Sequence, residues 1–235
     1  MHRWVWDLRY PEPKSLDREY PISAIYRDTP PIPSGPVVLP GTYTVKLTVG
    51  GKTLSQPLTI KMDPRVKAST ADMTQQLQIE SKLADLMNRD YDALEQVRSV
   101  RTQLKNRQSG ANRLSPELSQ TISNLDQKAA GLDGSGGRAA ARLGGGGDNL
   151  AALNSTLTAL LNAVDSSDVL PTTQQVKAAN ELQQAVERLL GQWNELKTRD
   201  IPALNEQLRR SNVPVLNPEA ASSDATTMGA AVDED

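Results

Sequence analysis

Residues 41–66 read GTYTVKLTVGGKTLSQPLTIKMDPRV, and they contain the clearest local signal of the chain. Pro40-Gly41 predicts a turn, after which apolar and polar residues alternate with the period of a half-buried strand. Gly50-Gly51 can supply the positive φ angles that a two-residue hairpin turn requires. The apolar positions of the two strands are Tyr43, Val45, Leu47 and Val49, then Leu54, Leu58, Ile60 and Met62. The stretch therefore predicts an antiparallel hairpin over residues 42–62.

The sequence before the hairpin is rich in proline and also predicts β-structure. Residues 4–10 alternate, with Trp4, Trp6, Leu8 and Tyr10 on one side, which indicates a strand. Seven prolines between residues 11 and 36 predict a long extended connection, with one short strand over residues 22–26. So few strands are marginally stable by themselves, and we expect either further upstream strands or helices to cover their apolar face. Residues 1–66 are interpreted as the C-terminal strands of a partial β-sandwich.

The chain changes character at Asp63-Pro64, and residues 67–213 show the periodicity of four amphipathic helices. The first opens at Ser69 or Thr70, with Asp72 placed for a capping box. The second has Ser115 as its cap and Pro116 in its first turn. The third is expected to cap at Asp148, and the fourth follows residues 171–173. The predicted core positions, in order along the four helices, are Met73, Leu77, Ala84, Met87, Tyr91, Leu94, Val97 and Leu104; Leu118, Ile122, Leu125, Ala129 and Leu132; Leu150, Leu153, Leu157, Leu160 and Val164; and Val176, Ala179, Val186, Leu190, Trp193, Leu204 and Leu208.

Helices with one apolar stripe each need partners, which predicts an antiparallel four-helix bundle and an α+β chain overall. Pro202 is expected to kink the fourth helix or to end it early. The glycine-rich residues 134–147 predict a flexible linker. Residues 214–235, which end in Asp233-Glu234-Asp235, predict a disordered acidic tail.

The composition excludes several classes of function. The chain has no Cys and only one His, so we expect no thiolate nucleophile, no multi-histidine metal site and no cofactor. Its net charge is −2 with both signs interspersed, whereas nucleic-acid binding requires a basic stripe. No run of about 18 apolar residues is present, so no membrane span is predicted. Charged residues interrupt the N-terminus, and no signal peptide is predicted there.

One group of residues could bind a ligand. Trp4, Trp6 and Tyr10 share a face of the predicted first strand and could stack on sugar rings, although packing in a core or against a neighbouring domain is the favoured interpretation. On the opposite face, Asp7 and Arg9 are interpreted as a structural polar pair.

No catalytic residue is predicted. The carboxylates on the predicted helices are interpreted as solvated faces, because nothing marks a cleft between two of them; these are Asp90 and Asp92, and Glu181 and Glu187. The pattern Gly134-x-Gly136-x-x-Ala139 resembles a dinucleotide fingerprint, but it follows a helix instead of a strand and is interpreted as linker.

Three segments together resemble the C-terminal region of bacterial BNR-repeat, sortilin-like glycosyl hydrolases. They are WVWDLRYPEP (residues 4–13), GPVVLPGTYTVKLTVGGKTLSQPLTIKMDPRV (35–66) and PTTQQVKAANELQQAVERLLGQWNELKTRDIPALNEQL (171–208). In that family a β-propeller precedes an immunoglobulin- or fibronectin-like module and a helical tail. The resemblance implies that any hydrolase activity belongs to the propeller, and no catalytic residue of the family can be placed on these positions.

The resemblance therefore leads us to expect a noncatalytic accessory region of a larger protein, packed against an upstream β-propeller in a periplasmic or extracellular setting. Two alternatives stay open. One is a carbohydrate-binding module that uses Trp4, Trp6 and Tyr10. The other is a helical module for oligomerisation or for binding a protein partner.

Overall fold

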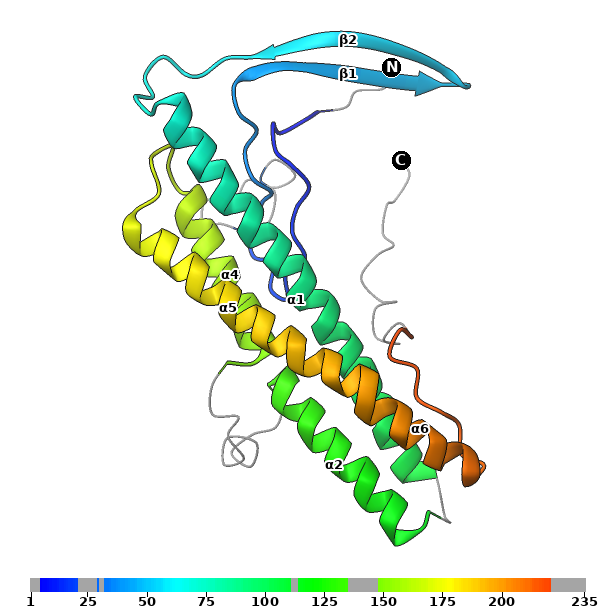
Figure 1. The fold of residues 1–235 in the computed structure, drawn as a ribbon. Coiled ribbons are helices and arrows are strands. Elements are labelled where there is room, and N and C mark those ends of the chain that lie inside the picture. The colour runs from blue at the N-terminus through cyan, green and yellow to red at the C-terminus, as the bar shows by residue number, and fades with distance from the viewer. Residues whose placement is uncertain (1–4, 21–28, 30–31, 111–113, 135–147, 221–235) are drawn as a thin grey trace. The chain divides into compact units, whose positions relative to one another are not determined.

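The computed structural model describes residues 5–20, 29, 32–110, 114–134 and 148–220. In this part of the chain an antiparallel pair of strands precedes a series of long helices, which confirms the predicted α+β class (Figure 1). The strands are β1 (Gly41–Val49) and β2 (Lys52–Ile60). The helices are α1 (Thr70–Gly110), α2 (Pro116–Asp133), α4 (Leu150–Asp165), α5 (Thr173–Glu195), the π-helix η2 (Leu196–Asp200) and α6 (Ile201–Arg210).

The predicted hairpin is confirmed. Nine residue pairs join its strands, from Gly41 opposite Ile60 to Val49 opposite Lys52. Gly50 and Gly51 form the turn with φ angles of 54° and 77°, a conformation that costs a residue with a Cβ atom more than it costs glycine.

The strand predicted over residues 4–10 is wrong. Residues 5–10 contain one isolated bridge, between Arg9 and Val37, instead of a ladder. Leu8 has a φ of 62°, which breaks the alternation of side chains that the prediction assumed. In the described residues of the proline-rich segment, 11–20, 29 and 32–36, a second isolated bridge joins Glu19 and Ile32. The short strand predicted over residues 22–26 lies outside the described residues.

The helices begin at local capping signals. Ser69 and Asp72 form the predicted capping box of α1, with distances of 2.9 Å and 3.2 Å between backbone nitrogen and side-chain oxygen. The Ser115 hydroxyl caps α2 as predicted, 3.2 Å from the backbone nitrogen of Leu118. At α4 the predicted cap is wrong by one residue, because the Asn149 side chain, and not that of Asp148, accepts a hydrogen bond from the Ala152 amide at 2.9 Å.

Pro202 does not end the last helix. Instead η2 precedes it, and the Ile201 amide donates to the carbonyl of Leu196, five residues earlier. A π turn fits here because proline has no amide to donate and its ring crowds the carbonyl four residues before it. The helix then continues to Arg210, so α5, η2 and α6 form one uninterrupted helical run.

The chain forms two compact units. Unit 1 comprises Met1–Asp85 and Thr158–Asn180, and unit 2 comprises Leu86–Leu157 and Glu181–Asp235. Because α1, α4 and α5 each contribute to both, the units divide within helices.

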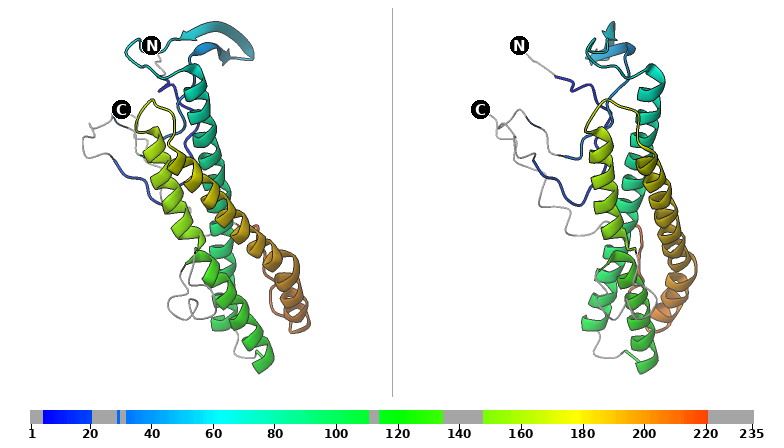
Figure 2. Two further views of the ribbon diagram at one scale, coloured as in Figure 1. Left: turned by 60° about the vertical axis from the view of Figure 1, so that its left-hand side comes forward. Right: turned by 90° about the vertical axis from the view of Figure 1, so that its left-hand side faces the viewer.

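Unit 1 holds the hairpin, the extended segment and parts of α1, α4 and α5. Its helices are joined by side chains, since Gln76 of α1 donates to the Val164 carbonyl of α4 at 3.2 Å and Lys82 donates to Asn180 of α5 at 2.8 Å. The hairpin lies near the N-terminal end of α1, and its turn points away from that helix (Figures 1 and 2).

Unit 2 places α2 and α6 side by side, as both figures show. Arg101 of α1 forms ion pairs with Asp126 and Asp133 of α2, at 2.9 Å and 2.5 Å. The chain after α6 also packs here, because the Leu216 side chain is 3% exposed and the Asn217 amide donates to Gln103 of α1. Residues 214–220 of the predicted tail therefore pack within unit 2; residues 135–147 and 221–235 lie outside the described part.

Every core position predicted in α2 is buried, but the other stripes need correction. In α4 the buried residue is Leu161, while Leu160 is half-buried. In α1 the fully buried residues follow a 4-3-4-3 spacing over Leu83, Met87, Asp90, Leu94 and Val97. The predicted stripe includes Met87, Leu94 and Val97 but not Asp90, because it was defined by apolar residues and Asp90 is a carboxylic acid.

Candidate interaction surface

The hairpin has one apolar and one polar face. Residues opposite each other in an antiparallel pair share a face, so Tyr43 with Leu58 and Leu47 with Leu54 bring the apolar positions together. The other face carries hydroxyl side chains, such as Thr48 and Thr53, whose oxygens lie 2.9 Å apart. We call the first the hairpin apolar face; its apolar members are Tyr43, Val45, Leu47, Val49, Leu54 and Leu58, and Gln56 and Lys52 lie on the same face opposite Val45 and Val49.

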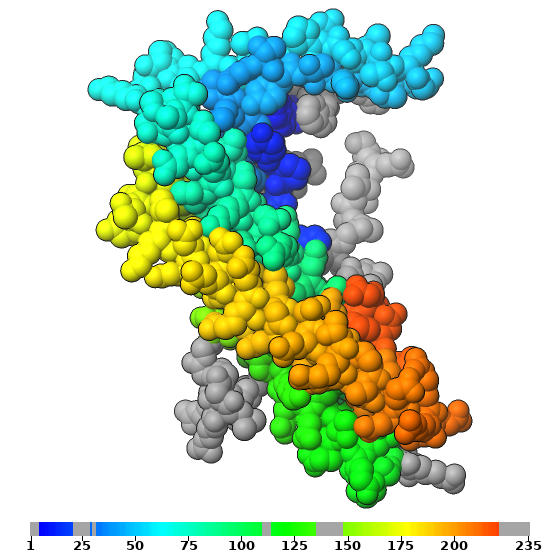
Figure 3. Space-filling view, in the orientation of Figure 1, coloured from blue at the N-terminus to red at the C-terminus, as the bar shows by residue number. Residues whose placement is uncertain are grey.

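The hairpin apolar face is exposed. Val45, Leu47, Val49, Leu54 and Leu58 are 43%, 57%, 67%, 69% and 37% exposed, although alternation of this kind is typical of a strand with one buried side. In the space-filling view the tip of the hairpin stands apart from the helical residues of unit 1 (Figure 3). The helices of the described part therefore do not cover this face. Among the described residues no further strand pairs with β1 or β2, so each is an edge strand with backbone groups available for pairing.

Tyr43 attaches the base of the hairpin to the extended segment. Its hydroxyl donates to the Leu39 carbonyl at 2.7 Å, and its ring meets that of Trp6 edge to face, with centroids 5.9 Å apart. Burial raises the pKa of the Tyr43 phenol, and Tyr10 adds a smaller contribution in the same direction. The exposed part of the hairpin thus projects from a fixed base.

The structure places the three predicted aromatic residues differently. Trp4 lies outside the described residues. Trp6 is half-buried, and its indole N–H donates to the Arg9 carbonyl at 2.9 Å, while Tyr10 is 46% exposed. Trp6 contacts the ring of Tyr43, a residue of the predicted hairpin and not of the predicted first strand. The two rings meet at an interplanar angle of 70°, so they do not form a flat platform on which a sugar ring could stack.

The polar pair predicted between Asp7 and Arg9 forms only through the backbone, since the Arg9 amide donates to Asp7 at 3.1 Å. The Arg9 guanidinium instead reaches Asp165 of α4 at 2.9 Å and the Gly35 carbonyl at 2.7 Å. These contacts of Arg9 join two parts of the extended segment to α4. Asp165 is 156 residues from Arg9 in the sequence, so only the tertiary structure identifies it as the ion-pair partner of Arg9.

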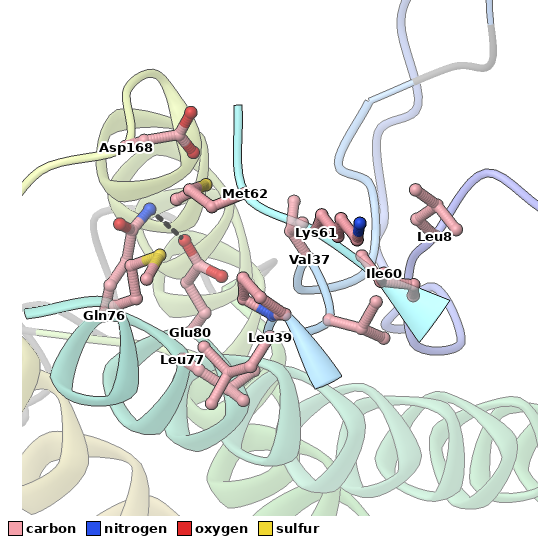
Figure 4. A pocket seen from close by; sticks show the side chains of 13 residues that line it. Leu8, Val37, Leu39, Ile60, Lys61, Met62, Gln76, Leu77, Glu80 and Asp168 are labelled. Carbon is pink, nitrogen blue, oxygen red and sulfur yellow. Dashed lines mark hydrogen bonds between the residues drawn. The ribbon is translucent and has the colours of Figure 1, made fainter. Parts of the chain in front are cut away.

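Glu80 is a buried carboxyl that the sequence interpretation missed. It is 1% exposed and accepts a hydrogen bond from Gln76 at 2.9 Å (Figure 4). Burial raises the pKa of Glu80 to about 7, and the Gln76 amide opposes that shift. Glu80 also lines a cavity of about 180 Å³ in unit 1.

Asp90 is a second buried carboxyl, in unit 2. It is 0% exposed, so its interpretation as part of a solvated face is wrong, whereas Asp92, Glu181 and Glu187 are exposed as expected. Neither Asp90 oxygen has a hydrogen-bond partner of good geometry among the described residues. Burial raises the pKa of Asp90 to about 7, and the buried Asn154 amide opposes that shift. Both carboxyls lie at helical spacing within the α1 stripe, and this spacing is the signal that could have found them.

Within the described residues, no group of three or more His, Cys, Asp or Glu side chains is placed to hold a metal ion. No helix in that part of the chain combines the length and apolar character needed to cross a membrane.

No protein-family model, curated protein or solved structure matches this chain.

Proposed function

We propose that this chain is a noncatalytic accessory region of a larger protein, and that the hairpin apolar face packs against a neighbouring domain of the same polypeptide. The observation that carries the proposal is the exposure of that face on a hairpin that pairs with no other strand in the described part of the chain. In this proposal the hairpin belongs to a partial immunoglobulin- or fibronectin-like sandwich, and α1, α2, α4 and the α5–α6 run form a four-helix bundle. The resemblance to BNR-repeat, sortilin-like proteins favours an upstream β-propeller as the neighbour, outside the cytoplasm.

The energetics favour a neighbour in the same chain over a free partner. Five side chains of the face are 37–69% exposed, so completing their burial contributes on the order of 5 kcal/mol. Association of two free proteins costs about 4–15 kcal/mol in lost translation and rotation. A tethered domain avoids most of that cost because its effective concentration is high.

The first test is to read the coding sequence upstream of Met1 and to produce the longer protein that it encodes. Hydrogen exchange of residues 41–60 is then compared between the longer protein and the present chain. We expect slower exchange in the longer protein, since a covering domain protects the hairpin amides. A stop codon directly upstream, or equal exchange in both proteins, contradicts the proposal.

Matched variants show which face is responsible. The triple variant Val45→Thr, Leu47→Thr, Leu54→Thr keeps β-propensity and removes apolar contact, so it is expected to abolish the extra protection. The control variant Lys46→Thr, Ser55→Thr changes a cross-strand pair on the polar face and is expected to retain it. If the present chain self-associates and the triple variant does not, the face belongs to a second copy and the tethered-domain proposal is wrong.

A further inference from the structure

Unit 1 contains a cavity with two chemically different ends. Its volume is about 180 Å³, and most of its lining is aliphatic. The lining comes from the extended segment, the end of β2 with the residues after it, the first turns of α1, and Asp168 between α4 and α5. Gln76, Glu80 and Asp168 gather toward one side of the cavity, whereas Leu8, Leu39 and Ile60 lie toward the other (Figure 4).

The polar end carries more negative than positive charge. Glu80 and Asp168 line the cavity, and Asp165 lies close enough to act on Glu80. The Arg9 guanidinium is engaged by Asp165 and by the Gly35 carbonyl, and Lys61 is the cation among the lining residues. A buried carboxyl of this kind favours a ligand that brings a positive charge and N–H donors.

Size limits the ligand further. A dry apolar cavity of about 150 Å³ holds a molecule the size of benzene, so the present cavity accommodates a small branched or cyclic hydrocarbon group with a head group. An anionic head group would meet the Glu80 and Asp168 carboxylates, and a purely apolar molecule would add neither charge nor a hydrogen bond to those that Glu80 already receives from Gln76 and the Val37 backbone.

We propose that this cavity binds a small primary ammonium compound, with its –NH₃⁺ group at Glu80 and its aliphatic part against Leu39 and Ile60. Nothing in this binding requires the neighbouring domain of the proposed function, so the two proposals succeed or fail separately.

The test uses the full chain and three probes of similar size: isoamylamine, isoamyl alcohol and isovalerate. Binding is followed by ¹H–¹⁵N chemical shifts of Val37, Gln76 and Glu80 near pH 8. We expect saturable binding of isoamylamine in the low millimolar range, binding of the alcohol that is weaker by roughly tenfold or more, and no saturable binding of isovalerate. Equal affinity for the amine and the alcohol, or no saturation by the amine, overturns the proposal.

Two variants and one control locate the site. Glu80→Gln keeps an acceptor for Gln76 and removes the charge, so it is expected to weaken amine binding by roughly tenfold or more. Leu39→Phe fills the apolar end and is expected to reduce binding of both the amine and the alcohol. Glu181→Gln changes an exposed carboxylate of α5 and is expected to change nothing. Unchanged amine affinity in Glu80→Gln, with a native-like spectrum, overturns the proposal.

Binding is also expected to depend on pH. Because burial holds the pKa of Glu80 at about 7, isoamylamine should bind more weakly at about pH 5.5 than at about pH 8. The charged groups that face Glu80 are Arg9, Asp165, Lys61 and Asp168, and the Glu80→Gln variant, which retains all four, should lose most of this dependence. A dependence that persists in the variant contradicts the assignment of Glu80 as the group that holds the ammonium.

Discussion

At the scale of single residues, Gly35 lies where two backbone segments come very close together. A Cβ atom there would lie 1.9 Å from the Tyr10 carbonyl oxygen and 2.7 Å from that of Pro11. Two distant parts of the extended segment can touch here only because residue 35 has no side chain.

Gly35→Ala is therefore expected to separate the two parts of the extended segment, with a loss of about 1–3 kcal/mol in the free energy of unfolding. The amides of Tyr10 and Val38, which donate to Pro36 and Leu8 at 2.9 Å, should exchange faster in the variant. Gly41→Ala is the matched control, since the nearest atom to its Cβ is 3.8 Å away. Unchanged exchange of both amides in Gly35→Ala would disprove the contact.

At the scale of elements, the attachment of α2 to α1 depends on Arg101. The side chains of Asp126 and Asp133 are 25% and 5% exposed, and both pair with the 11%-exposed Arg101 side chain. The two acids are seven residues apart, about two helical turns, so they lie on one face of α2. Removing the arginine leaves the buried Asp133 without this cation.

We expect Arg101→Ala to lower the free energy of unfolding by about 3–5 kcal/mol, as measured by urea denaturation. The control is Arg98→Ala, which removes a more exposed pair with Glu95 at 3.5 Å on the same helix and should cost about 0.5 kcal/mol or less. Equal losses in the two variants would show that the pairs with Asp126 and Asp133 do not hold α2 in place.

At the scale of the whole molecule, the described residues of each unit include one buried carboxyl whose pKa is raised to about 7, Glu80 in unit 1 and Asp90 in unit 2. A raised carboxyl pKa means that the folded state binds the proton more tightly than the unfolded state. Its contribution to stability is present below the unfolded-state pKa and is lost as pH rises through the folded-state pKa. Asp63, Asp72, Glu117 and Asp200 have lowered pKa values and are ionised in both states above about pH 5.

The chain is therefore expected to be more stable at about pH 5 than at about pH 8, by roughly 2 kcal/mol for each of the two carboxyls. Urea denaturation across this range measures the difference. The double variant Glu80→Gln, Asp90→Asn should remove most of the dependence, while Asp92→Asn, on an exposed position of α1, should leave it unchanged. Higher stability of the wild type at about pH 8 would contradict the burial of both groups.

Much of the fold could be predicted where the signal is local. The turn at Gly50-Gly51, the alternation of the hairpin and the caps at Ser69 and Ser115 involve residues within a few positions of one another. The apolar set of the candidate surface followed from that alternation, but its exposure did not. Exposure depends on which other segments cover the strands, and those contacts are remote in sequence.

The amino-acid sequence by itself therefore determined the α+β class, the hairpin and its register, and most helix boundaries, because turns and caps satisfy backbone groups through nearby side chains. Tertiary structure alone decided that Leu8 breaks the predicted first strand, that Arg9 pairs with Asp165, and that Asp90 is buried. Each of these outcomes follows from how segments distant in the sequence meet. The partner of a charged side chain and its exposure to solvent depend on tertiary contacts between segments remote in the sequence, and no local sequence pattern specifies those contacts.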